Sequence, residues 1–139
     1  MNLLEEEMSP RALWLIWGGL TYSLLFYAVI GYLVRRSNSL PLATEMLPVL
    51  VPLFIVLGLV ETSAVLYFVP KYFKAKNYAS YSVTRWALAE AIGVHGLILF
   101  ILGTSWMFFG TFLGWALLLN FMLMPNENDR NKFNSLKSS

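Results

Sequence analysis

Long apolar stretches, separated by short polar and basic segments, dominate the chain. Residues 13 to 34 and 46 to 69 form two such stretches, and residues 86 to 124 form a third. About 20 apolar residues in a helix cross the hydrocarbon core of a bilayer. The pattern therefore predicts a membrane protein in which each of the first two stretches is one spanning helix.

The third stretch is too long for a single crossing. As one helix it would measure roughly 58 Å, nearly twice the thickness of the ~30 Å core. The polar residues near its middle are Gly103-Thr104-Ser105, so we place a tight turn there. The expected fold is all-α, with four transmembrane helices at about 13–34, 46–69, 86–103 and 106–124 in two antiparallel hairpins.

The remaining sequence adds no second domain. The tail, 125–139, is rich in Asn and Ser and shows no apolar period, so we expect it to be disordered. Only 13% of the residues are charged, against about 25% in a soluble domain. The absence of cysteine excludes disulfides and thiolate metal sites. We find no nucleophile–base pair, metal signature or nucleic-acid patch, and expect neither enzymatic activity nor a cofactor.

The distribution of Lys and Arg predicts the orientation, because cytoplasmic loops carry an excess of basic residues. With a cytoplasmic N-terminus, only Arg35 and Arg36 lie outside. The inside carries Arg11, Lys71, Lys74, Lys76, Arg85, Arg130, Lys132 and Lys137. Both termini should therefore be cytoplasmic, and we expect a multi-pass protein of the bacterial inner membrane.

The loop between the second and third spans is basic and contains interleaved aromatic residues. Its basic residues, and the candidates for contacts with anionic lipid headgroups, are Lys71, Lys74, Lys76 and Arg85. The alternative is that this loop only anchors the protein at the interface, with its charges on the cytoplasmic side.

Three ionisable residues inside the apolar stretches are the candidates for chemistry: Glu61, Glu90 and His95. Such groups are costly in hydrocarbon and either have a partner or carry a proton. Counted inward from Lys71 and Arg85, Glu61 and His95 lie roughly 15 Å deep and Glu90 roughly 7 Å deep. Glu61 and His95 could therefore meet on adjacent spans.

Each of these residues also has a structural interpretation. Glu61 can be satisfied by a neighbouring hydroxyl or backbone group, Glu90 can reach the cytoplasmic interface, and His95 can be a hydrogen-bonded packing residue. The hydroxyl groups of the first span are the natural donors for the glutamates. They belong to Thr21, Tyr22, Ser23, Tyr27 and Tyr32.

Small residues in the third and fourth spans are spaced for close helix packing. They are Ala89, Gly93 and Gly96, and further on Gly110 and Gly114. The spacing predicts a helix interface, either with another span of this chain or with another protein. Trp14, Trp17, Trp86 and Trp106 fall near the ends of the expected spans, as in an aromatic belt.

The run Ala89-Glu90-x-x-Gly93-x-x-Gly96-Leu97-Ile98 resembles the carboxylate-bearing helix of rotary ATPase proteolipids, the c-type ring subunits. The resemblance covers residues 85–99. It implies that Glu90 carries a proton or sodium ion and that the glycines around it permit tight packing.

The residues favour one function and leave a second open. The first is a small non-enzymatic subunit of a larger membrane complex, whose intramembrane polar residues make helix–helix or partner contacts. The alternative is a proteolipid-like component that translocates protons or ions, with Glu90 or Glu61 as the carrier. The partners expected in both cases are the lipid bilayer and other membrane protein subunits.

Overall fold

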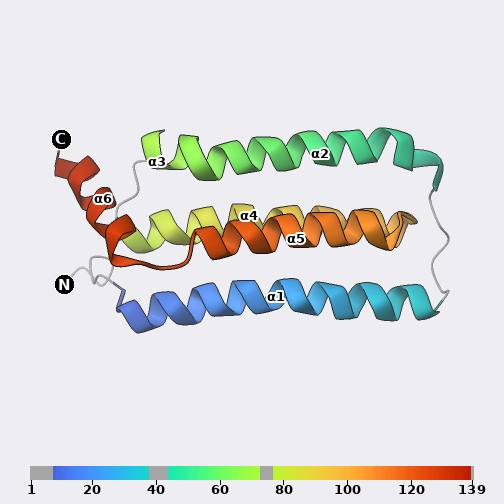
Figure 1. The fold of residues 1–139 in the computed structure, drawn as a ribbon, viewed down its shortest axis with the longest axis horizontal. Coiled ribbons are helices and arrows are strands. Elements are labelled where there is room, and N and C mark those ends of the chain that lie inside the picture. Colours follow the sequence, from blue (N-terminus) through green and yellow to red (C-terminus); the bar gives the residue numbers. More distant parts are fainter. Residues whose placement is uncertain (1–7, 38–43, 73–76, 139) are drawn as a thin grey trace, which may run out of the picture.

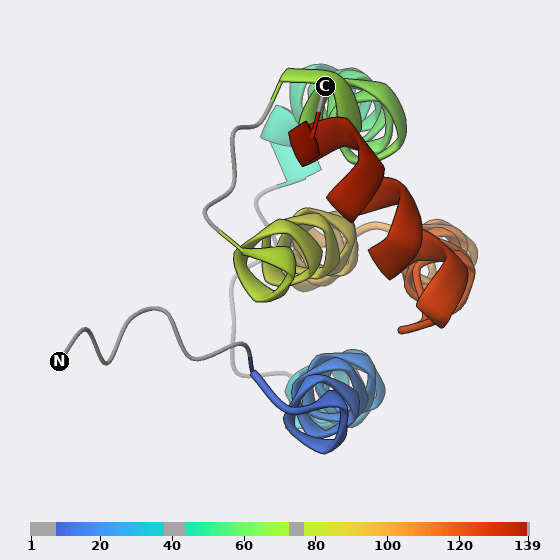
Figure 2. The same ribbon diagram turned by 90° about the vertical axis from the view of Figure 1, so that its left-hand side faces the viewer.

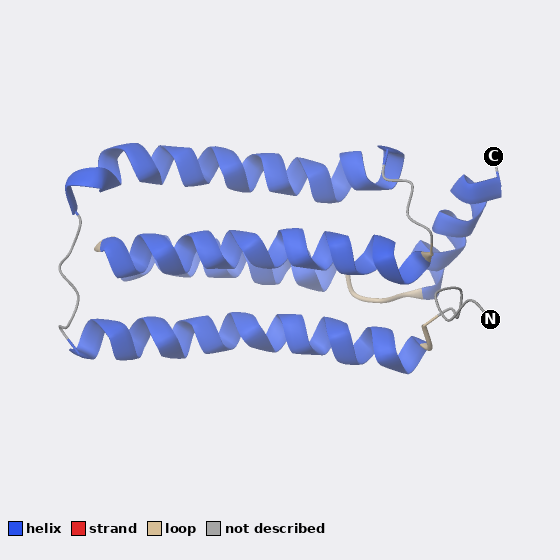
Figure 3. Cartoon of the chain, turned by 180° about the vertical axis from the view of Figure 1, so that it is seen from behind, coloured by secondary structure: helices blue, strands red, loops and turns tan. Residues whose placement is uncertain are grey.

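The computed structural model describes residues 8–37, 44–72 and 77–138, and all regular structure in these ranges is helical (Figure 1, Figure 3). The order of elements is α1 Pro10–Ser37, η1 Thr44–Met46, α2 Leu47–Ser63, η2 Ala64–Phe68, α3 Val69–Tyr72, α4 Tyr78–Leu102, α5 Trp106–Met122 and α6 Glu127–Ser138. The segments η1, α2, η2 and α3 form one continuous rod.

Three of these helical units are long and apolar enough to cross a membrane: Pro10–Ser37, Thr44–Tyr72 and Tyr78–Leu102. A fourth crossing is obtained if α5 and α6 are taken as one span, bent by 72°. The expectation of an all-helical chain with several membrane-length apolar helices is confirmed.

The third helix begins well before residue 86, where we expected its span to start. Asn77 caps it, because its side-chain oxygen accepts a hydrogen bond from the Ser80 N–H at 2.9 Å. The first two turns of α4 are therefore a polar and aromatic extension of the apolar helix.

The turn predicted at 103–105 separates α4 from α5. Gly103 has a φ of 120°, a backbone conformation that favours glycine. The Thr104 N–H then donates to the Leu99 carbonyl at 3.0 Å, which closes the helix end in a Schellman-type arrangement. The boundary between the two helices is thus set by one glycine.

Helix α4 is the centre of the bundle. It packs against α1, α2 and α5, as the end-on view shows (Figure 2). In its most apolar stretch 44% of the residues are buried, against 11% in α1 and 11% in Thr44–Tyr72. Most residues of α1 and α2 therefore lie outside the core. The large side chains that they expose are mainly apolar.

The small residues of α4 produce this central position. Ala89, Gly93 and Gly96 are buried, and a Cβ on Gly93 would overlap the Leu24 side chain. A Cβ on Gly96 would lie 2.5 Å from the Phe112 Cβ. The predicted packing role of these three residues is confirmed, with α1 and α5 as the neighbours.

Gly110 and Gly114 behave differently. A Cβ added to either would meet nothing within 4 Å, and both residues are exposed on α5. The interpretation that they pack against another span of this chain is therefore wrong, and an external contact stays a prediction.

Two tryptophans expected at the interface make hydrogen bonds to α5: Trp86 is buried and Trp17 is partly buried. The Trp86 indole N–H donates to the Leu123 carbonyl at 2.8 Å, and that of Trp17 donates to the Asn120 carbonyl at 2.9 Å. Both acceptors lie at the C-terminal end of α5, where helix carbonyls lack internal donors. The belt prediction is wrong for Trp86, which is only 1% exposed.

The expectation of a disordered tail is also wrong for residues 127–138, which form α6. Asn126 caps this helix by accepting from the Asp129 N–H at 2.7 Å. Phe133 packs on the rings of Tyr78 and Tyr81, with centroids 5.9 and 5.2 Å away. An aromatic anchor and a cap together order a sequence that has no apolar period.

Candidate functional site

Glu61 of α2 and His95 of α4 meet inside the bundle. Glu61 Oε2 lies 3.4 Å from His95 Nδ1, and the two side chains are only 18% and 15% exposed. Neither of these two atoms has a hydrogen-bond partner, and both are shielded from solvent. The predicted meeting of Glu61 and His95 is confirmed as a close contact between a carboxyl oxygen and a ring nitrogen.

The ring of His95 is fixed by an aromatic neighbour. Phe54, two turns before Glu61 on α2, stacks on the imidazole with a centroid distance of 4.8 Å and an interplanar angle of 6°. The stacking limits rotation of the ring and keeps Nδ1 directed towards α2. Phe54 is a site residue that sequence analysis missed, because a phenylalanine in an apolar span carries no distinguishing signal.

The helix geometry changes three residues after Glu61. Residues Ala64–Phe68 form a π-helical segment, and the Val69 N–H donates to the carbonyl of Ala64, five residues back. Pro70 has no N–H and cannot supply the next bond. The Val65 carbonyl therefore loses its helical donor, and the Arg85 Nε–H donates to it at 3.1 Å.

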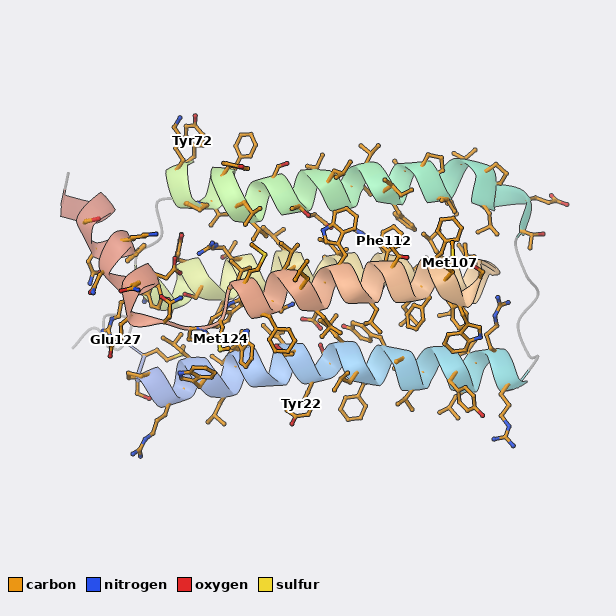
Figure 4. All side chains as sticks on the ribbon, in the orientation of Figure 1. Tyr22, Tyr72, Met107, Phe112, Met124 and Glu127 are labelled. Atoms are coloured by element: carbon orange, nitrogen blue, oxygen red, sulfur yellow. The ribbon has the colours of Figure 1, made fainter. Side chains whose placement is uncertain are left out.

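Glu90 contacts two hydroxyl groups of α1. The Tyr27 hydroxyl donates to Glu90 Oε1 at 2.7 Å, and the Ser23 hydroxyl makes a short hydrogen bond to the same oxygen. The prediction that donors from the first span satisfy a glutamate is confirmed for Ser23 and Tyr27. Tyr22 and Tyr32 are 66% and 51% exposed, and Tyr22 points away from the bundle (Figure 4).

The interpretation that Glu90 reaches out to the interface is wrong, because Glu90 is directed at α1. The Ser23 Oγ also lies 2.6 Å from the Leu20 carbonyl. Since a hydroxyl has one hydrogen, Ser23 can donate to an ionised Glu90. It can alternatively donate to Leu20 while accepting from a protonated Glu90. The arrangement accommodates both charge states of the carboxyl.

Arg85 is the centre of a third polar cluster. Its Nη1 donates to the Tyr81 hydroxyl at 3.0 Å and forms an ion pair with Asp129 of α6 at 3.1 Å. The guanidinium also lies 5.0 Å from the centroid of the Tyr81 ring. Arg85 thus contacts the π-helical segment Ala64–Phe68, Tyr81 of its own helix α4, and Asp129 of α6.

This arrangement corrects the assignment of Arg85 to lipid headgroups, because the residue is only 9% exposed and its Nε and Nη1 donate to groups inside the protein. Lys71 is exposed, with its Nζ 5.2 Å from the Tyr72 ring centroid, and its contact with a lipid headgroup stays a prediction. Lys74 and Lys76 lie outside the described residues.

The cluster around Arg85 was missed because its partner, Asp129, lies in the tail that we expected to be disordered. A usable signal was present. Asn126 precedes Asp129 by three residues, and an Asn followed three residues later by an acid is typical of a helix start.

The three clusters define what this chain can do chemically. Two carboxyls and one imidazole lie in apolar surroundings with partners from neighbouring helices, a setting suited to structural contacts or to proton transfer. No group of three metal-ligating side chains occurs within the ranges that the structure describes. Comparison with family models, with curated proteins and with solved structures gave no match.

Proposed function

We propose that this chain is a small, non-enzymatic integral membrane subunit of a larger membrane protein complex. The proposal is based on the contacts that Glu61, Glu90 and His95 make. Each contacts a side chain of a neighbouring helix in the same chain. These polar groups then serve to fix the bundle, and the outer faces of α1 and α2 remain for contacts with lipid and other subunits.

The proposed topology has both termini in the cytoplasm of a bacterial cell. The basic residues Arg11, Lys71 and Arg130 lie at the end of the bundle where α1 begins and α6 lies (Figure 1). Arg35 and Arg36 lie at the opposite end, in the last turn of α1. This distribution supports the proposal through the preference of basic residues for the cytoplasmic side.

A substitution at Glu90 tests the proposal. Glu90→Gln keeps the size of the side chain and an acceptor oxygen, and removes the ionisable proton. The subunit function predicts that the yield of the assembled complex falls, while any ion-driven activity per assembled complex is unchanged. Full assembly with loss of ion-driven activity would contradict it.

A second function, translocation of protons or ions by a proteolipid-like component, is favoured by two observations. Glu61 Oε2 and His95 Nδ1 lie close together without other partners. Ser23 can also exchange its hydrogen between Leu20 and Glu90. Proteoliposomes that contain the purified chain and a pH-sensitive dye test this function: it predicts proton flux that Glu61→Gln or Glu90→Gln abolishes.

A further inference from the structure

A pocket of about 160 Å³ opens at the end of the bundle where α1 begins and α5 gives way to α6. One wall comes from the first turn and a half of α1, with Pro10, Leu13 and Trp14. The opposite wall comes from Tyr78 and the start of α6, with Glu127 and Arg130. Figure 4 shows Glu127 at this end of the molecule. Since a water molecule takes roughly 30 Å³ in the liquid, the pocket has room for a small polar group.

The α6 wall is held in place by contacts already described. Asp129 pairs with Arg85, and the Tyr78 hydroxyl donates to the same carboxylate at 3.4 Å. Phe133 is packed on Tyr78 and Tyr81. These contacts hold the first turns of α6, which carry Glu127 and Arg130, against α4, so the pocket exists before any ligand enters.

The charges of the pocket identify the chemistry of its ligand. Glu127 and Arg130 are three residues apart on α6, which brings them to neighbouring positions on one helix face. A guanidinium has five N–H donors and binds phosphate bidentately, also when some donors have other partners. A carboxylate accepts from an ammonium group. The cationic Arg130 and the anionic Glu127, side by side, complement a ligand in which a phosphate is joined to an amine.

The position of the pocket identifies the source of that ligand. It lies where the apolar helices α1 and α5 end and the polar helix α6 begins, and Trp14, 45% exposed, is on its rim. Tryptophan at the end of an apolar helix is typical of the headgroup level of a bilayer. A phosphate and an amine at this level belong to a phospholipid.

We propose that this pocket binds the headgroup of phosphatidylethanolamine, with its phosphate on Arg130 and its ammonium on Glu127, and with the acyl chains along the exposed faces of α1 and α5. The inference needs only that the apolar helices lie in a bilayer, and it does not depend on the subunit function.

Lipid retention by the purified full-length chain tests the proposal. The delipidated protein is mixed with equal amounts of phosphatidylethanolamine, phosphatidylglycerol and phosphatidylcholine of identical acyl chains, washed in detergent, and its bound lipid is quantified by mass spectrometry. We expect phosphatidylethanolamine to exceed each of the others by about threefold, the size of one partly exposed ion pair. Phosphatidylcholine is the informative competitor, because its methylated nitrogen keeps the charge and lacks N–H donors.

Variants separate the two charges. Arg130→Gln should reduce retention of all three lipids, and Glu127→Gln should remove the preference for phosphatidylethanolamine over phosphatidylglycerol. Lys132→Gln and Glu45→Gln are matched controls on exposed positions outside the pocket and should bind as the unaltered protein does. Retention of the three lipids by the unaltered protein in the proportions offered would overturn the proposal, as would an unchanged preference in Glu127→Gln.

Discussion

Glu61 Oε2 lies 3.4 Å from His95 Nδ1 between two otherwise apolar helices, and neither atom has another partner. The hydrogen bond from Arg85 Nε to the Val65 carbonyl is a second polar contact between the rod that contains Glu61 and α4. The two contacts together set the rotation and axial position of α2 against α4, so disruption of the Glu61–His95 pair should lower the stability of the bundle.

A double-mutant cycle measures this coupling. We expect Glu61→Gln and His95→Gln each to lower the melting temperature in detergent, and the variant with both substitutions to lose less than the sum of the two. The exchanged variant Glu61→His with His95→Glu should recover part of the loss, because it restores the same two groups. Interaction energies of about 1 kcal/mol are typical for polar pairs within membranes. Additive losses, with no recovery in the exchanged variant, would contradict a direct pairing.

The hydroxyl donors of Glu90 provide a second prediction. Tyr27→Phe and Ser23→Ala each remove one hydrogen bond to the carboxyl and should cost about 1 kcal/mol of unfolding free energy. Tyr22→Phe and Tyr32→Phe are matched controls, because both side chains point outwards. Thermal unfolding of the four variants in one detergent checks the contrast. Equal effects at Tyr22 and Tyr27 would argue against the hydrogen bond to Glu90.

The glycines of α4 and α5 should respond oppositely to alanine. Gly93→Ala and Gly96→Ala place a methyl group against Leu24 and Phe112, and overpacking of this kind costs about 1–3 kcal/mol. Gly110→Ala and Gly114→Ala meet open space and should leave the melting temperature unchanged or raise it, since alanine favours helix. A lower yield of the complex in these two variants alone would place a partner on that face of α5.

Asp129→Asn should loosen α6. The substitution removes the charge that pairs with Arg85, and the Asp129 side chain is 28% exposed, so we expect a cost of about 1 kcal/mol. Hydrogen exchange should accelerate in residues 127–135 and remain unchanged in α1. Lys132→Gln is the control on the exposed face of the same helix. Unchanged exchange in α6 would mean that Phe133 alone holds this helix.

Much of the fold was accessible from the sequence because apolar length is a strong signal in a membrane protein. The turn at Gly103 follows from an apolar stretch that is too long for one crossing. The meeting of Glu61 with His95 follows from counting residues inward from Lys71 and Arg85. The contact of Glu90 with Tyr27 and Ser23 followed from the need of each group for a partner.

The remainder depended on contacts that no local pattern encodes. The burial of Arg85 requires both the carbonyl of Val65, freed by Pro70, and a carboxylate from α6. The order of α6 in turn requires the aromatic surface of Tyr78 and Tyr81 for Phe133. The outward position of Gly110 and Gly114 could not be derived either, since spacing defines a helix face and not its neighbour.

The most direct test of the proposed function is the native mass of the particle that contains this chain after extraction from its membrane in mild detergent. The subunit function predicts a heteromeric assembly of fixed stoichiometry, in which this chain occurs with other membrane proteins. A particle built from this chain alone, as a monomer or as a closed ring of identical copies, would contradict it, and the ring would favour the ion-translocating alternative.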